Sequence, residues 1–156
     1  VLESGVGSGA LCMTLERAGA VVRGYELRED FANRATKNVA TFLGEEALAR
    51  YTVEQRNAYE GIDETDLDRV VLDLPEPWQV VKHAAKAMHR GGVLVAYTPQ
   101  ITQAVQLRDE LSGQGFGMVD TLEVLNRGWH IDGQSVRPDH RMVAHTGFLT
   151  TARLLS

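Results

Sequence analysis

Residues 1–11 read Val-Leu-Glu-Ser-Gly-Val-Gly-Ser-Gly-Ala-Leu, and the fold predicted for the whole chain depends on this stretch. Val1 and Leu2 are typical of the end of a buried strand, and residues 10–18 carry the apolar spacing of a helix. The glycines between them predict a strand-turn-helix unit, because glycine permits unusual φ and ψ angles and lets a ligand approach bare backbone. The free N–H groups at the helix start favour an anionic or carboxylate-bearing ligand.

Two acidic residues make this prediction more specific. The glycine spacing is G-x-G-x-G, which differs from the G-x-G-x-x-G of a typical dinucleotide site. Glu3 stands two positions before the first glycine, and Glu26 ends the next expected strand, where α/β nucleotide-binding folds place an acceptor for ribose hydroxyls. The pattern favours a nucleotide-containing ligand, and an ordinary tight turn is the alternative.

Strand-like and helix-like patterns alternate along the rest of the chain, which predicts βαβ units and a parallel sheet. Expected strands span residues 1–2, 20–26, 51–55, 68–74, 93–98, 116–125 and 144–152. Expected helices span residues 10–18, 29–43, 78–89 and 101–111, with a short helical connection at 44–50. The last two strands have no helix between them. We therefore expect a Rossmann-like α/β fold with a seven-stranded, mostly parallel sheet, one antiparallel edge strand, and helices on both faces.

The composition is that of one globular domain covering residues 1–156. The apolar fraction is 44% and the charged fraction 24%. No apolar run approaches the ~20 residues of a membrane span, and no signal peptide is visible. Cys12 is the single cysteine, so an internal disulfide is excluded and a reducing compartment, the cytoplasm, is expected.

A second motif, Asp73-Leu74-Pro75-Glu76-Pro77-Trp78, follows the expected fourth strand. Ligands of open α/β sheets lie beyond the carboxyl ends of the strands, near the point where strand order reverses. We therefore expect Asp73 beside the glycine turn. The two prolines restrict the backbone and stiffen the loop. The alternative is an exposed acidic turn in which Trp78 is the first core residue of the next helix.

Together these motifs resemble known families. Glu-x-Gly-x-Gly-x-Gly with the downstream Glu26 resembles motif I of class I S-adenosylmethionine (SAM) methyltransferases. Asp-x-Pro-x-Pro-Trp is similar to the motif of the tRNA 1-methyladenosine methyltransferases, which act on adenine 58 in the tRNA T-loop. The C-terminal elements that share this resemblance are Arg127-Gly128-Trp129, Arg137-Pro138 and His145-Thr146-Gly147-Phe148-Leu149. The resemblance runs from residue 1 to about residue 153.

The resemblance implies a cytoplasmic, RNA-binding transferase of tRNA processing that uses SAM and releases S-adenosyl-L-homocysteine. It also implies a homotetramer whose subunits carry a small β-rich N-terminal domain. That domain is absent from this sequence, which begins inside an expected strand without an initiator methionine. We therefore expect a further segment to precede residue 1.

The resemblance also implies site residues. Asp73 is the expected catalytic residue, because a carboxylate near the target base would balance the positive charge that N1 methylation creates. Asn57 stands where many relatives have aspartate, and its amide oxygen can still accept a hydrogen bond from the cofactor adenine. The expected cofactor-binding residues are Glu3, Gly5, Gly7, Ser8, Gly9, Ala10, Leu11, Glu26, Asn57, Ala58 and Asp73.

The substrate contacts are expected from aromatic and basic side chains. A base turned out of its stack needs an aromatic or apolar surface, although each aromatic candidate could instead belong to the core. The chain has net charge −5, but residues 127–153 carry a local balance of +2, and RNA binding needs only a local basic patch. A solvated loop with scattered arginines is the alternative. The expected tRNA contacts are Trp78, Tyr97, Arg127, Trp129, Arg137 and His145.

No metal is expected, because the histidines lack metal-ligand spacing. Two other functions stay open. The glycine motif also permits a class I methyltransferase that acts on a protein carboxylate or a small molecule, although residues 73–78 disfavour it. A catalytically silent RNA-binding subunit is disfavoured because the glycine turn and Asp73 are intact.

Overall fold

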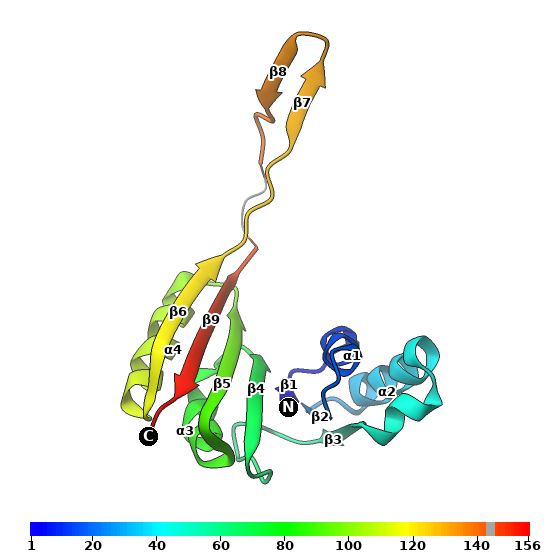
Figure 1. Cartoon of the computed structure of the whole chain (residues 1–156), viewed down its shortest axis with the longest axis vertical. Coiled ribbons are helices and arrows are strands. Elements are labelled where there is room, and N and C mark those ends of the chain that lie inside the picture. The colour runs from blue at the N-terminus through cyan, green and yellow to red at the C-terminus, as the bar shows by residue number, and fades with distance from the viewer. Residues whose placement is uncertain (143–145) are drawn as a thin grey trace.

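The computed structural model describes residues 1–142 and 146–156 and contains a seven-stranded sheet flanked by helices (Figure 1). The strands of this sheet are β1 (Leu2–Ser4), β2 (Val22–Glu26), β3 (Tyr51–Gln55), β4 (Leu67–Asp73), β5 (Met88–Thr98), β6 (Phe116–Glu123) and β9 (Phe148–Leu154). The helices are α1 (Ala10–Arg17), α2 (Glu29–Leu43), α3 (Trp78–Ala87) and α4 (Ile101–Gly113), with a 3₁₀ helix, η1 (Glu45–Ala49).

The strand order is β3-β2-β1-β4-β5-β9-β6, which confirms the predicted fold class. Strands β1 to β5 are mutually parallel, whereas β9 runs antiparallel to both β5 and β6. The antiparallel strand therefore lies one place in from the edge, and β6 occupies the edge itself. The order reverses between β1 and β4, so the ligand crevice of an open α/β sheet is expected beside these two strands.

Two apolar clusters hold the helices on the sheet. One packs α3 and α4 against β1, β4, β5 and β9, and the other packs α1 and α2 against β2 and β3. Strand β2 gives Tyr25 to the first cluster and Val22 to the second. Residues three apart in a strand point to opposite faces, so the clusters lie on opposite sides of the sheet.

Several predicted boundaries are wrong, and the largest differences involve β5 and the last strand. The helix expected to reach residue 89 ends at Ala87, and Met88 already pairs with Leu67 of β4. Strand β5, expected to begin at residue 93, therefore begins at Met88 and runs through Gly91 and Gly92, and the β4–β5 register shifts there to accommodate the extra residues. The last strand, expected at 144–152, is Phe148–Leu154; residues 143–145 lie outside the described part of the chain.

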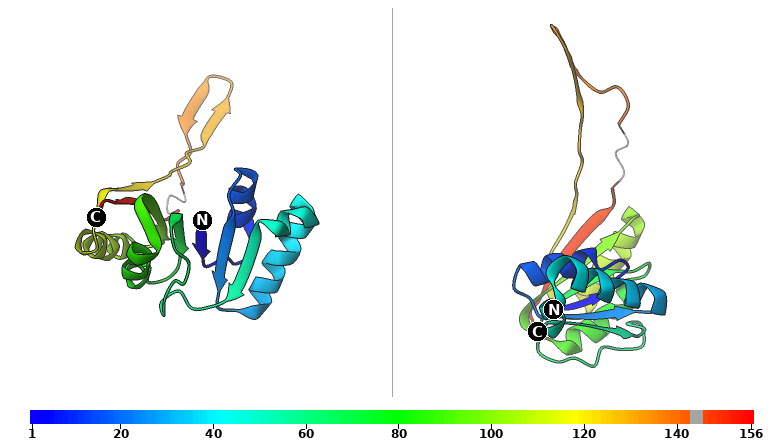
Figure 2. Two further views of the ribbon diagram at one scale, coloured as in Figure 1. Left: turned by 60° about the horizontal axis from the view of Figure 1, so that its bottom comes forward. Right: turned by 90° about the vertical axis from the view of Figure 1, so that its right-hand side faces the viewer.

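The insert between the last two sheet strands forms a separate hairpin, which we call the arm. Strands β7 (Trp129–Asp132) and β8 (Ser135–Pro138) pair antiparallel with each other and with no other strand of the described residues. The arm projects away from the sheet beyond β6 and β9 in every view (Figures 1 and 2).

Every helix of the described residues is too short or too polar to cross a bilayer.

Candidate active site

The glycine turn lies in direct contact with the end of β4. The Gly5 N–H donates to the Tyr25 carbonyl over 3.1 Å, and Gly5 has a φ of +87°. A Cβ added at Gly5 would overlap the carbonyl oxygen of Asp73. Only glycine permits this approach, which brings the turn and the Asp73 loop to the same place.

Glu26 supports the turn from the end of β2. Its carboxylate is largely buried and accepts hydrogen bonds from the backbone N–H groups of Gly7 and Arg28, each over 3.0 Å. The two bonds orient the carboxylate, which still has lone pairs for further donors. This arrangement suits an acceptor for ribose hydroxyls at the turn.

Two cavities meet at Gly5. The larger, of about 350 Å³, is mostly apolar and is lined by residues that include Tyr25, Glu26, Leu27, Asn57, Ala58 and Leu74. The smaller, of about 210 Å³, is lined by Glu3, Gly7, Ser8, Ala10, Leu11 and Asp73, among others. An apolar cavity and an acidic cavity therefore share Gly5 as a lining residue.

Of the expected cofactor residues, the structure places all except Gly9 at one of these cavities. Gly9 is buried, its N–H donates to the Val6 carbonyl over 3.0 Å, and an added Cβ would lie 3.1 Å from Ala35 of α2. Its place in the fold is therefore the close packing of α1 on α2. Asn57 lines the larger cavity, but its amide oxygen already accepts from the Tyr59 N–H.

Glu3 is the most unusual ionisable group of the site. It is 2% exposed, lines the smaller cavity, and its Oε2 atom has no hydrogen-bond partner. Burial, together with the nearby charges of Asp73 and Glu26, raises the pKa of Glu3 to about 8. Because no cationic side chain of the described residues lines this cavity, it favours a ligand that carries a positive charge.

Asp73 ends β4 with its side chain exposed at the smaller cavity. Partial desolvation raises the pKa of its carboxyl group. Asp73 pairs in register with Tyr97 of β5, so the two side chains leave the same face of adjacent strands. The Tyr97 hydroxyl donates to the Thr146 carbonyl over 2.7 Å. The structure thus brings one of the expected aromatic residues next to Asp73.

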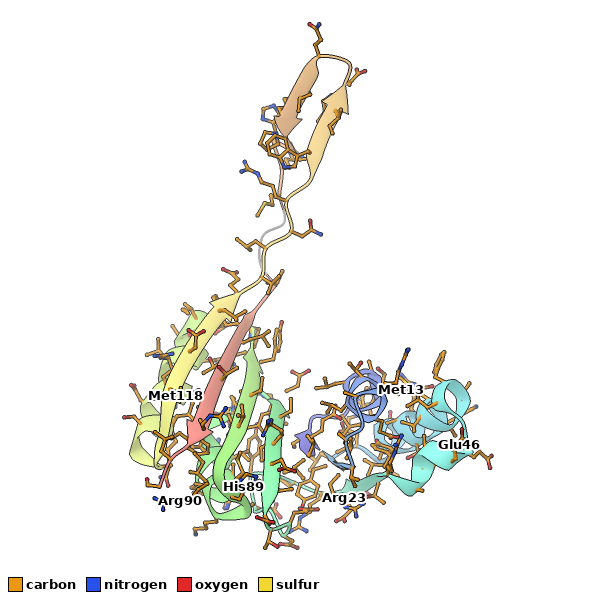
Figure 3. All side chains as sticks on the ribbon, viewed as in Figure 1. Met13, Arg23, Glu46, His89, Arg90 and Met118 are labelled. Atoms are coloured by element: carbon orange, nitrogen blue, oxygen red, sulfur yellow. The ribbon has the colours of Figure 1, made fainter. Side chains whose placement is uncertain are left out.

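The other expected substrate residues are elsewhere. Trp78 begins α3 and packs against the core, as the alternative interpretation held. Trp129 and Arg137 belong to β7 and β8 of the arm, and Arg127 lies two residues before β7. The arm projects away from the rest of the ribbon (Figure 3). Trp129 is 58% exposed, so a core role for it is wrong. His145 lies outside the described residues.

Several site residues were missed by the sequence analysis. Tyr25 and Leu27 flank Glu26 and line the larger cavity, and this adjacency was a usable signal. Tyr59 lines the same cavity and accepts a hydrogen bond from the Glu76 N–H over 3.1 Å, a contact that sequence spacing does not reveal. In residues 1–142 and 146–156 no three His, Cys, Asp or Glu side chains are grouped to hold a metal ion.

The fold is that of a class I SAM-dependent methyltransferase. It is defined by the strand order of the sheet, by the glycine turn, and by the acidic residues that end β2 and β4. Residues 1–139 match the family described as tRNA methyltransferase complex GCD14 subunit, and the chain belongs to that family. The family resemblance that the motifs indicated is therefore confirmed.

Curated relatives agree with this placement. The chain is 36% identical to the tRNA (adenine(57)-N(1)/adenine(58)-N(1))-methyltransferase TrmI of Methanocaldococcus jannaschii, over 99% of this chain and 64% of the relative. It is also 36% identical to the tRNA (adenine(58)-N(1))-methyltransferase TrmI of Thermus thermophilus, over 98% of this chain and 60% of the relative. The chain thus spans less than two thirds of either relative.

Solved structures show the same fold. A structure described as a SAM-dependent O-methyltransferase from Thermotoga maritima superimposes with a TM-score of 0.87 at 33% identity, over 99% of this chain and 59% of that one. The tRNA (m1A58) methyltransferase TrmI from Aquifex aeolicus superimposes with a TM-score of 0.79 at 25% identity, over 99% of this chain and 62% of that one.

Alanine at Gly5 should destabilise the protein more than alanine at Gly7. Both have positive φ, but an added Cβ at Gly7 meets no atom within 4 Å. Gly7→Ala should therefore cost only the left-handed backbone strain, roughly 1–2 kcal/mol. Gly5→Ala must also displace the end of β4 and should cost about 1–3 kcal/mol more. Urea unfolding measures both, and equal losses would contradict the close contact with Asp73.

Glu3 should make stability fall as pH rises. Its pKa is raised from an ordinary value of 4.5 to about 8, so the folded state holds a proton that the unfolded state releases. This contribution is complete below pH 4.5 and is lost as pH rises towards 8, by an amount on the order of a few kcal/mol. Glu3→Gln should flatten the loss of Tm across this range.

The matched control for Glu3→Gln is Glu29→Gln, on the exposed first turn of α2, which should leave the slope unchanged. Part of the slope should remain in Glu3→Gln, because burial also raises the pKa of Glu16. A wild-type slope in Glu3→Gln would show that Glu3 is ionised in the folded protein at neutral pH.

Proposed function

We propose that residues 1–156 form the catalytic domain of a cytoplasmic, SAM-dependent tRNA (adenine(58)-N(1))-methyltransferase. The observation that carries the proposal is the position of Asp73, which opens into the acidic cavity at Gly5 and lies beside Tyr97. Family membership and the similarity to the TrmI proteins of two organisms support the same activity.

The cavities suit SAM on chemical grounds. The buried, unpartnered Glu3 oxygen in a cavity without a cation fits the ammonium group of the methionine part. The oriented Glu26 carboxylate fits the ribose hydroxyls, and the apolar larger cavity with Ala58 and Leu74 fits the adenine. When bound, SAM would supply a methyl group activated by its sulfonium charge.

Asp73 would act on the target adenine. Methylation of N1 leaves the base positively charged, and a partly desolvated carboxylate stabilises such charge more strongly than one in water. The carboxylate would also accept a hydrogen bond from the exocyclic amine and so align N1. Alignment of reacting groups can account for roughly 7–11 kcal/mol of a barrier.

The arm is the proposed contact for tRNA and for further subunits. In its register Trp129 pairs with Pro138 and Ile131 with Val136, so these apolar side chains share one face. His130, Asp132, Ser135 and Arg137 occupy the opposite face, and Arg127 lies at the base. The polar face, with Arg137, would contact tRNA phosphates, and the exposed apolar face would pack in a homotetramer.

The solved structure from Thermotoga maritima is described as an O-methyltransferase, which keeps a second candidate function open. In that case the same cavities would serve methyl transfer to an oxygen of a small molecule or a protein. The two functions separate on the substrate. Methyl incorporation into an unmodified tRNA transcript should be abolished when adenine 58 is replaced by guanine. Transfer that ignores this change, or no transfer to tRNA, would contradict the proposal.

Asp73→Asn and Asp73→Ala should keep SAM binding within about threefold and reduce methyl transfer by roughly 10²–10³-fold, because the transition-state charge loses its partner. Asparagine keeps an acceptor oxygen, so a smaller loss in Asp73→Asn would measure alignment apart from charge. Calorimetry and single-turnover transfer provide the two readouts. Asp109→Asn, on an exposed part of α4, is the control. Wild-type transfer by Asp73→Ala would refute the assignment.

Replacing Arg127 and Arg137 together by alanine should weaken tRNA binding several-fold and lower the slope of log affinity against log salt by about 2. SAM binding should not change, because both residues are remote from the cavities. Arg69→Ala, at an exposed arginine of β4, is the control. An unchanged salt slope in the double variant would exclude the arm from phosphate contact.

A further inference from the structure

We propose that Gln103 is a positioning residue of the active site, whose carboxamide holds the loop after β4 against the turn after β5. The proposal rests on the function proposed above, since it gives Gln103 a role in methyl transfer that Asp73 carries out. Gln103 touches neither cavity, and it would act through the backbone of the Asp73 loop.

The carboxamide of Gln103 uses both of its ends. Its Nε2 group donates to the Pro75 carbonyl over 2.9 Å, and its Oε1 atom accepts from the Gln100 N–H over 3.0 Å. Pro75 lies two residues beyond Asp73, and Gln100 lies three residues beyond Tyr97. One side chain therefore joins the two segments that follow the Asp73–Tyr97 pair.

The backbone cannot make this connection itself. Asp73 and Tyr97 are the last register pair of β4 and β5, and a proline lies two residues beyond each of them, Pro75 and Pro99. Proline has no N–H to donate, so the strand ladder cannot continue through these positions. The Gln103 side chain instead joins the loop after β4 to the turn after β5, through its hydrogen bonds to Pro75 and Gln100.

A second hydrogen bond holds the Asp73 loop from its other side. The Glu76 N–H donates to the Tyr59 hydroxyl, from the segment between β3 and β4. Gly5 supports the loop at Asp73 itself. With these contacts intact, loss of the Gln103 bond should loosen the loop while the domain stays folded.

A purely structural role for Gln103 is the competing explanation. Gln100 and Gln103 also form a capping box at the start of α4, so Gln103 could serve only to stabilise that helix. Gln103→Glu separates the two roles. The carboxylate can still accept from the Gln100 N–H, but it has no proton to donate to Pro75 at neutral pH.

The test compares Gln103→Glu with two controls on the same helix. Gln106→Glu adds the same charge at an exposed position, and Ala104→Gly weakens α4 without altering either hydrogen bond. Hydrogen exchange of the peptide covering residues 72–80 reports the loop, and single-turnover transfer to tRNA reports the chemistry. SAM affinity and KM for tRNA are measured alongside.

In Gln103→Glu we expect exchange in residues 74–78 to rise about tenfold, since the loop opens locally. The transfer rate should fall roughly 10- to 100-fold from misalignment, with SAM affinity and KM within about threefold. Both controls should keep wild-type exchange in this segment and wild-type transfer. In an Asp73→Ala background, Gln103→Glu should cause no further loss of rate, because the two act as one unit.

Unchanged exchange in Gln103→Glu would overturn the proposal, and so would faster exchange with a wild-type transfer rate. An additive loss in the Asp73→Ala background would also overturn it. If the wild-type protein transfers no methyl group to tRNA, the proposed function fails, and the exchange comparison still decides whether Gln103 holds the loop.

Discussion

Gly5 and the Asp73 carbonyl approach each other so closely that no side chain fits between them. This contact joins the two halves of the sheet at the point where the strand order reverses. It places the acidic cavity and the apolar cavity on either side of one residue. The same contact brings the Asp73 carboxylate of β4 next to the glycine turn, so the proposed cofactor site and the proposed catalytic residue meet at one backbone junction.

The electrostatics of the site follow from this packing. Glu3, Glu26 and Asp73 come from three adjacent strands and lie around the same turn, but they are held differently. Glu26 receives two backbone N–H donors, whereas Glu3 is buried with one oxygen unpartnered. The first arrangement provides an oriented anion for hydroxyl groups. The second leaves a buried carboxyl group, and a cationic ligand would offset the cost of its desolvation.

The arm and the sheet differ in how much of their surface is exposed to solvent. The sheet strands are covered by helices, while the arm presents both of its faces to solvent in the described structure. Its apolar and polar side chains separate by strand alternation, so the two faces suit partners of different chemistry. This division underlies our proposal that the polar face, with Arg137, contacts tRNA phosphates although the chain as a whole is acidic.

By itself the sequence determined the fold class, the glycine turn, and the acids Glu3, Glu26 and Asp73. These follow from local periodicity, from glycine and proline chemistry, and from the rule that parallel strands bring their carboxyl ends to one edge. The helix end at Ala87 could not be predicted from the helical pattern, because Met88 pairs with Leu67 of β4, a residue distant in the sequence.

Only the tertiary structure decided which aromatic residue lies beside Asp73. The β4–β5 register pairs Tyr97 with Asp73, whereas Trp129 belongs to the arm. The tertiary structure likewise placed Gly9 in the α1–α2 packing and not at a cavity, and it revealed the hydrogen bonds of Tyr59 and Gln103 to the Asp73 loop. Such contacts join residues far apart in the chain, and their existence depends on strand register and helix packing, which local sequence patterns do not encode.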